Sequence, residues 1–148
     1  MAVIHIDPSA APGGDGSEAN PYSGWEGVPI TAGNTYLQKA GTIHTGTVFI
    51  DQDNVTLGAY GTGGRPAVKG QIVIENAGGV TVEGYEVSGA ETAGIAVLGQ
   101  SPDLTISDCD IHSNATGIKV RDGAADGLLI ENCAIHENDT IGILAYES

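Results

Sequence analysis

An internal repeat in the second half of the chain constrains its fold more than any other feature. Residues 104–120 (LTISDCDIHSNATGIKV) align with residues 128–144 (LLIENCAIHENDTIGIL), and matched positions lie 24 residues apart. The matched pairs are apolar, thiol, imidazole and amide residues: Leu104 with Leu128, Ile106 with Ile130, Cys109 with Cys133, Ile111 with Ile135, His112 with His136 and Asn114 with Asn138. A Gly-Ile pair also recurs at 94–95, 117–118 and 142–143. Periods of this length predict stacked structural units.

The repeated units consist of strands rather than helices. Apolar residues alternate within a unit, as at Leu104 and Ile106 and again at Ile118 and Val120, and a period of two is typical of β-strands. The amphipathic stretches of ten or more residues that helical repeats need are missing from the sequence, as is the L-x-x-L-x-L frame of leucine-rich repeats. We therefore predict an all-β solenoid with two or three short strands per coil. Equivalent positions of successive coils should lie ~4.8 Å apart.

The pattern divides the chain into an irregular N-terminal cap, residues 1–35, and about five coils, residues 36–148. The cap is rich in Pro, Gly, Ser and Asp, and a solenoid needs such a cover over its exposed strand edges. Trp25 in the cap is expected to plug the end of the core, with stacking of Trp25 or Tyr22 on a sugar ring as the alternative. Residues 141–148 begin another coil, so the C-terminal end is expected to be unfinished, either truncated or stacked on something else.

The charge balance narrows the choice of partners. The chain has 19 acidic and 5 basic residues, and its formal net charge is −14. Such a surface repels nucleic acid and anionic membranes, so neither is expected as a partner. It would also repel a polyanionic polysaccharide unless cations or residues outside this sequence intervened. The excess of carboxylates is explained either by solubility or high-salt adaptation or by cation binding, for which calcium is the expected ion. The sequence contains no run of 18 apolar residues, so no membrane span is predicted. The first residues lack the pattern of a secretory signal.

Several phrases of the sequence are similar to a known family. The segments 15–22 (DGSEANPY), 34–46 (NTYLQKAGTIHTG) and 54–61 (NVTLGAYG) resemble the opening of pectate-lyase-like right-handed parallel β-helix proteins. The later phrases N-x-T-G-I-x-V, at 114–120, and I-x-N-C-x-I-x-x-N, at 130–138, resemble the repeats of polysaccharide lyases, mannuronan epimerases and phage tail-spikes. The resemblance implies a right-handed parallel β-helix and an extracellular, cell-surface or virion location.

The same resemblance implies that an extended polysaccharide lies in a groove along one parallel sheet. Lyases of this superfamily use a Lys or Arg base, with calcium or another cation offsetting the uronate charge, and its hydrolases use paired aspartates. The hydrolase signature N-T-D occurs here only in altered order, at 138–140, and the D-D, G-H-G, R-I-K and D-P-H motifs are absent from the sequence. No complete catalytic signature is therefore transferred, because fold and chemistry are separable.

Lys119 and Arg121 are the first candidate catalytic residues. They are two apart on an expected strand, so both side chains face the same side, outward if Val120 points inward. This arrangement suits a lyase base beside a cation that neutralises the substrate. The simpler interpretation is two exposed charges that pair with Asp122 or Glu131.

His112 and His136 occupy one ladder of the repeat. Stacked imidazoles suit acid–base catalysis or metal binding, with Asp110 or Glu137 as neighbours, but they also occur as ordinary surface residues beside turns. Carboxylates cluster in the same coils, at Asp108, Asp110, Asp122, Asp126, Glu131 and Asp139. Asp108, Asp110 and Glu131 are the candidate calcium ligands. Paired carboxylates for glycoside hydrolysis and solvated loops are the alternatives.

Cys109 and Cys133 should stack on one another, with their Cα atoms ~4.8 Å apart. This spacing lies within the range that a disulfide tolerates, but buried free thiols that behave as small apolar residues are the preferred interpretation. A catalytic cysteine would need a base partner, for which the sequence offers no supporting context.

Two functions from different classes follow from these patterns. The first is the N-terminal part of a carbohydrate-active protein, a polysaccharide lyase or depolymerase that acts on uronate-rich glycan. The second is a non-catalytic structural or glycan-binding solenoid that self-associates through its open C-terminal coil.

Overall fold

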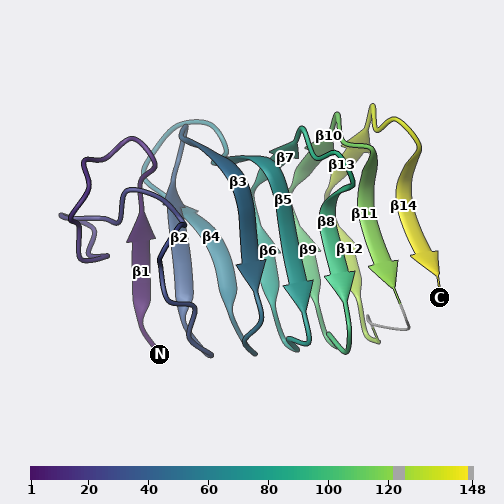
Figure 1. Ribbon diagram of the computed structural model, residues 1–148, viewed down its shortest axis with the longest axis horizontal. Coiled ribbons are helices and arrows are strands. Elements are labelled where there is room, and N and C mark those ends of the chain that lie inside the picture. The colour runs from purple at the N-terminus through teal and green to yellow at the C-terminus, as the bar shows by residue number, and fades with distance from the viewer. Residues whose placement is uncertain (122–125, 147–148) are drawn as a thin grey trace.

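The chain winds into a solenoid of parallel β-strands (Figure 1). The computed structural model describes residues 1–121 and 126–146, and within these residues it contains strands and no helix. No helix long and apolar enough to cross a membrane occurs among the described residues. The first sheet has the strand order β1 (Val3–Ile6), β2 (Thr35–Lys39), β4 (Thr56–Tyr60), β6 (Thr81–Glu83), β9 (Thr105–Ser107) and β12 (Leu129–Glu131).

The second sheet is bent into two arms. Its order is β13 (Ala134–His136), β10 (Asp110–His112), β7 (Glu86–Ser88), β5 (Ala67–Glu75), β8 (Ala93–Leu98), β11 (Thr116–Arg121) and β14 (Ile141–Tyr146), and β3 (Ile43–Ile50) pairs with β5. The first residues of β5 pair with β7, and its last residues pair with β8. We call β7, β10 and β13 the short arm, and β8, β11 and β14 the long arm.

Glycines let β3 and β5 pass through the corner between the two arms without a break. Gly70 has a φ of 147°, and a Cβ atom there would lie 2.2 Å from the carbonyl oxygen of Gly46, which is opposite it in register. Only glycine fits this close approach of two backbones. In the later coils a turn separates the two arms instead.

The predicted fold class and the 24-residue register are confirmed. Ile111 pairs with Ile135 and His112 pairs with His136, and all strand pairs of the short arm are parallel. In the first sheet the path from β2 to β12 makes four turns, and β13 and β14 add most of a fifth, close to the five coils expected. Cys109 and Cys133 lie on adjacent coils, because the amide of Ala134 donates to the carbonyl of Cys109 at 2.9 Å.

The turns repeat along with the strands. Two pairs of non-glycine residues with positive φ lie 24 residues apart: Asp108 (55°) with Asn132 (53°), and Ser113 (58°) with Glu137 (53°). Such angles give the sharp corners that a narrow coil needs, and they are uncommon for residues with a side chain. The period of the sequence is therefore also a period of the backbone conformation.

The core is a continuous column of inward-facing aliphatic side chains, closed at the N-terminal end by aromatic residues. Trp25 is 6% exposed, belongs to the core cluster and packs at a ring-centroid distance of 6.0 Å from Tyr36. Its indole Nε1 donates to Oε1 of the fully buried Gln38 at 2.9 Å. The prediction that Trp25 plugs the core is confirmed.

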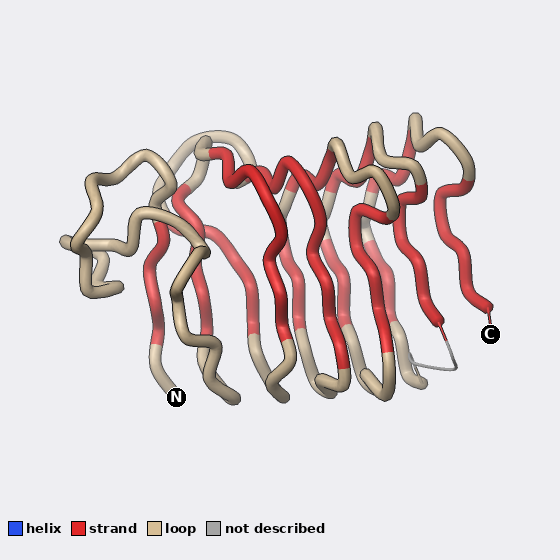
Figure 2. The backbone as a smooth tube through the Cα atoms, viewed as in Figure 1, coloured by secondary structure: helices blue, strands red, loops and turns tan. Residues whose placement is uncertain are grey.

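Residues 1–35 are mostly irregular, as expected, but they also contribute a strand. Figure 2 shows the loops of this region gathered beside the first strands. Val3–Ile6 forms β1, which extends the first sheet by pairing with β2, and Ile6 forms an isolated bridge with Tyr22. Strand β1 was not among the predicted strands, although its VIHI sequence has strand character.

On the last described coil, core-type side chains are covered on one side only. Ile141 is 38% exposed and Ile143 47% exposed, whereas Ile118, which pairs with Ile143, is fully buried. This coil is the least buried part of the solenoid.

Candidate functional site

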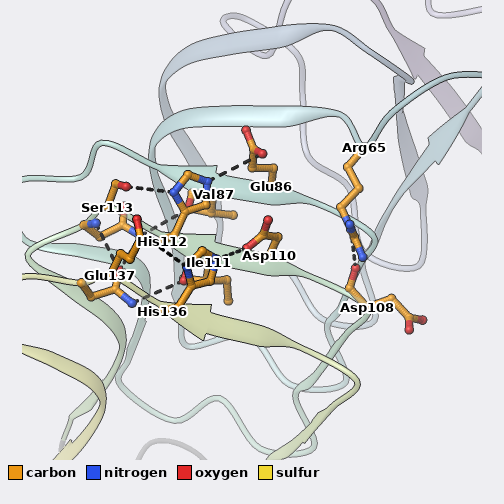
Figure 3. Close-up of polar contacts among 12 residues, drawn as sticks. Arg65, Glu86, Val87, Asp108, Asp110, Ile111, His112, Ser113, His136 and Glu137 are labelled. Carbon is orange, nitrogen blue, oxygen red and sulfur yellow. Dashed lines mark hydrogen bonds and ion pairs between the residues drawn. The ribbon is translucent and has the colours of Figure 1, made fainter.

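The outer face of the short arm carries a cluster of imidazoles and carboxylates. Val87 and Ile111 point into the core, so the residues on either side of them point outward. The outward positions bring Glu86 opposite Asp110, and His112 opposite His136. We call these four residues the histidine–carboxylate cluster (Figure 3).

The cluster has a regular geometry. The rings of His112 and His136 are stacked, with centroids 5.2 Å apart and an interplanar angle of 20°. His136 Nε2 lies 2.8 Å from Asp110 Oδ1, and His112 Nε2 lies 3.6 Å from Glu86 Oε2. Each histidine therefore faces the carboxylate that lies 26 positions earlier, on the preceding coil.

The cluster is accessible without being fully exposed. The side chains are 24% exposed at His112, 28% at Asp110, 43% at Glu86 and 45% at His136. A carboxylate that accepts a hydrogen bond from one ring nitrogen fixes the orientation of an imidazole and leaves the other nitrogen free to take or give a proton. The predicted ladder of His112 and His136 is confirmed, and it has the parts of an acid–base site.

Glu86 was missed by the sequence analysis, although a signal for it existed. The segment GYEVSG, residues 84–89, aligns with DCDIHS, residues 108–113, and this alignment places Glu86 under Asp110. The coil carries neither the Cys nor the His of the later repeats, so the match rests on Glu86 and Val87 alone. The structure confirms that alignment.

The three predicted calcium ligands are not brought together. Asp110 lies on β10 in the short arm, whereas Glu131 lies on β12 in the first sheet. Asp108 occupies the turn before β10, where its carbonyl oxygen accepts a hydrogen bond from Arg65 Nε at 2.9 Å, and its carboxylate points away from the cluster (Figure 3). Among the described residues, the group with ligand atoms within 4.8 Å of one another is Glu86, Asp110 and His112.

Lys119 and Arg121 lie elsewhere, on the outer face of the long arm. Val120 between them is buried, which meets the condition stated for this pair, so both project outward toward the side chain of Tyr146 on the next strand. Lys119 Nζ lies 5.6 Å from the Tyr146 ring centroid, and Arg121 Cζ lies 5.8 Å from it. We call these three residues the cationic patch. The predicted partner Asp122 lies outside the described residues, and within the described part of the chain neither Lys119 nor Arg121 forms an ion pair with Glu131.

The outer face of the first sheet offers a third surface. Thr35, Thr56, Thr81 and Thr105 follow one another in register, each half-buried. Beside them lies a depression of about 360 Å³, lined by Thr35, Leu37, Thr56, Gly58, Ala59, Glu83 and Gly84. The two glycines leave room there that side chains would otherwise fill.

The cysteines are free thiols and take no part in these surfaces. Cys109 is fully buried and Cys133 half-buried. Burial raises the pKa of the Cys109 thiol to about 11, and its sulfur donates to the carbonyl of Ser107 at 3.3 Å. An inert, buried thiol is the preferred interpretation of the sequence, and Cys109 confirms it.

The fold is a solenoid of parallel β-strands, and its polar and charged side-chain clusters lie on the outer faces of the sheets. These features define the class of the protein as a parallel β-helix. The chain belongs to the right-handed β-helix family: the family model described as a right handed beta helix region matches residues 22–148. A search of curated protein sequences finds no match.

Solved structures with the same fold include a GH136 lacto-N-biosidase from Eubacterium ramulus, in two crystal structures. The selenomethionine derivative aligns with a TM-score of 0.75 at 14% identity, over 88% of this chain and 33% of the enzyme chain. The native protein aligns with a TM-score of 0.71 at 14% identity, over 88% of this chain and 30% of the enzyme chain. This chain thus spans about a third of the length of the structures it resembles, and the similarity establishes the fold.

Proposed function

We propose that this chain is the glycan-contacting β-helix of a carbohydrate-active protein, and that its substrate is a polysaccharide with carboxylate groups, such as a uronate-rich glycan. The family resemblance and the fold shared with a glycoside hydrolase support the general class. The observation that carries the substrate assignment is the cationic patch. An extracellular, cell-surface or virion location stays a prediction.

The cationic patch stands out because the chain is otherwise acidic. Two of the five basic residues project from one strand toward one aromatic ring. Among the Lys and Arg side chains in the described part of the chain, Lys39 forms an ion pair, with Asp7. Lys119 and Arg121 form no ion pair with a described residue. Guanidinium and ammonium groups that form no ion pair with a described residue are suited to a substrate carboxylate, which a guanidinium binds with two parallel hydrogen bonds.

The same groups support a lyase reaction. In β-elimination, a base removes the proton beside the uronate carboxylate, and its electron pair forms a carbon–carbon double bond as the glycosidic carbon–oxygen bond breaks. The leaving oxygen then takes a proton. We assign Arg121 to the substrate carboxylate, which lowers the energy of the developing negative charge, and Lys119 to the base. His136, which Asp110 orients, lies on the short arm and is a candidate base only for a substrate bound there.

The first sheet supplies a surface for the length of a glycan. Hydroxyl groups of the four stacked threonines repeat at the strand spacing, and they can donate to or accept from sugar hydroxyls. Neutral contacts of this kind hold any polysaccharide. The cationic patch lies on the other sheet, so it would bind acidic glycans at a place separate from the threonine surface.

Binding and product formation test the proposal separately. We expect oligogalacturonate or oligoalginate to bind at low salt, and neutral oligosaccharides of equal length to bind at least tenfold more weakly. The double variant Lys119→Gln/Arg121→Gln should lose about ten- to a hundredfold in affinity, as expected when charged hydrogen bonds are removed. Lys69→Gln is the matched control, because Lys69 is exposed on β5 and lies outside the patch. Equal affinity for acidic and neutral glycans would sink the proposal.

The non-catalytic solenoid is the second candidate function. The observation in its favour is the exposure of Ile141 and Ile143 on the last described coil. A lyase releases unsaturated, ultraviolet-absorbing products from alginate or pectin, whereas a binding solenoid shifts the glycan in an affinity gel without releasing any. A solution mass of twice the monomer would support self-association.

A further inference from the structure

We propose that Glu86, Asp110 and His112 form a binding site for a divalent ion that accepts imidazole ligands, with Zn²⁺ as the reference ion. The site lies on the short arm, and the inference does not depend on the glycan proposal. Its first support is geometric. One ligand atom from each of the three side chains lies within 4.8 Å of the other two, and His112 Nε2 lies 3.6 Å from Glu86 Oε2.

One of these separations is close to what a tetrahedral ion requires. With metal–ligand bonds of about 2.0–2.1 Å, two ligand atoms of one zinc ion lie roughly 3.3 Å apart. The 3.6 Å between His112 Nε2 and Glu86 Oε2 is longer than a hydrogen bond and close to this ligand–ligand distance. Small rotations of the partly exposed side chains are enough to reach it.

The contacts around His112 orient the ring for coordination through Nε2. Its other nitrogen, Nδ1, lies 2.9 Å from the hydroxyl oxygen of Ser113. If Nδ1–H donates to that hydroxyl, the lone pair of Nε2 faces the two carboxylates, an arrangement that favours a cation between them. Metal-binding histidines characteristically donate their second nitrogen in this way.

Asp110 has an outer partner of the same kind. Its Oδ1 lies 2.8 Å from His136 Nε2 on the following coil, so His136 holds the carboxylate in place (Figure 3). A ligating carboxylate is commonly hydrogen-bonded by a residue that does not touch the metal. The stacked histidines thus take different roles: His112 as a ligand and His136 as the positioning residue.

The donor set decides the kind of ion. Calcium takes oxygen ligands, whereas imidazole suits zinc and its neighbours in the transition series. Two carboxylates also provide the negative charge that offsets a divalent ion. Three protein ligands leave a fourth position for water or a substrate oxygen, and the partial exposure of the three side chains gives access to it.

Metal titration of the full chain, without a histidine tag and after treatment with a chelator, tests the site. We expect one Zn²⁺ per chain by calorimetry, one Co²⁺ with a visible ligand-field spectrum, and a rise in Tm with Zn²⁺ that the chelator reverses. His112→Gln and Glu86→Gln should each weaken binding by about a hundredfold or more, beyond the ~10–100-fold expected for a change outside the ligand shell.

Two further variants separate ligands from positioning residues. Ser113→Gly should weaken binding by about tenfold and keep the Co²⁺ spectrum, because it removes the hydroxyl and glycine occupies the equivalent turn position at Gly89. His5→Gln is the control for non-specific histidine binding, since His5 lies on the first sheet against Tyr60, and it should change nothing. Wild-type protein that binds Ca²⁺ as tightly as Zn²⁺, or Zn²⁺ affinity unchanged in His112→Gln and Glu86→Gln, would overturn the assignment.

Discussion

The two ends of the solenoid are built on different principles. In the coils from β6 to β14 the same contact is made again on the next coil. Asn114 Oδ1 accepts from the amide of Ala90 at 2.9 Å, and Asn138 Oδ1 accepts from the amide of Asn114 at 3.1 Å. From β1 to β5 several side-chain contacts instead occur only once, as between Trp25 and Gln38.

Other contacts made only once hold the N-terminal end. The hydroxyl of Tyr36 donates to the carbonyl of Pro29 at 2.9 Å and accepts from the amide of Thr31 at 2.7 Å. The buried Tyr85 donates to the carbonyl of Gly58 at 2.9 Å, which links the two halves. In the regular coils of a repeat protein, many equivalent contacts each contribute to stability. At the end of the solenoid, where the core must be covered, a few individual residues make the stabilising contacts.

The sharpest contrast is between two glycines, and it carries the largest expected effect. Gly70→Ala should destabilise the protein by roughly 3–6 kcal/mol, or prevent folding, because the new Cβ would clash with the Gly46 backbone at a φ that alanine avoids. Gly89→Ala, at a φ of 79° with no backbone within 4 Å of the new Cβ, should cost only about 1–2 kcal/mol. Urea unfolding of both variants measures the difference. Equal costs would mean that the strands that pass through the corner do not require a glycine there.

The next comparison tests how much stability a core side chain gains when a coil covers it on both sides. Ile111→Ala should cost roughly 2–5 kcal/mol, since this side chain is fully buried between two coils and its loss leaves a cavity. Ile135→Ala, at the same position on the last coil, should cost less because Ile135 is only partly buried. If thermal unfolding ranks the pair the other way, the last coil contributes more than its exposure indicates.

A smaller effect should appear at the N-terminal end as a pH dependence. Burial lowers the pKa of His44, against a weaker opposing effect of Glu26, and its Nε2 has no hydrogen-bond partner among the described residues. The unfolded chain therefore binds this proton more readily than the folded one, so stability should fall as the pH drops below about 6.5. The loss of Tm between about pH 7.5 and 5.5 should be smaller in His44→Gln than in the wild type. An unchanged loss would show that His44 is protonated as easily in the folded protein.

The smallest expected effect concerns the two stacked thiols. The raised pKa of Cys109, about 11, keeps it a neutral thiol at pH 8, and its burial blocks reagents. A maleimide should label one thiol per native chain rapidly at about pH 8, at Cys133, and both after denaturation. Cys133→Ser should abolish the rapid labelling, and Cys109→Ser should leave it intact. Rapid labelling of two thiols would show that the adjacent coils separate.

The sequence predicted what is periodic and missed what is particular. The 24-residue spacing fixes the register, so the stacking of Ile111 on Ile135 and of His112 on His136 followed directly. Position alone could not show that Asp108 turns away from Asp110, because the left-handed backbone at Asp108 redirects its side chain. Position alone also could not show that Arg65 donates to the carbonyl of Asp108. These two residues are 43 positions apart, and no equivalent hydrogen bond is found on the next coil among the described residues.

The candidate site was predictable in part for the same reason. Lys119 and Arg121 were placed on one outer face by the alternation of the strand, and Val120 confirms it. Their neighbour Tyr146 was not foreseen, although the Gly-Ile pairs at 117–118 and 142–143 give the step of 25 residues that places Tyr146 beside Arg121. A change of one residue in the repeat length changes which side chains lie opposite each other on neighbouring coils.

The constant offset of 26 between a histidine and its carboxylate has a consequence for how such a chain can vary in evolution. Insertion or deletion of a whole coil preserves the strand register on both sides of the change, since each strand again meets an equivalent strand. A single inserted residue within a strand instead exchanges its inward and outward sets, exposing isoleucines and burying carboxylates. Length variants should therefore differ by complete windings, and the number of pairs displayed along the short arm should vary with them.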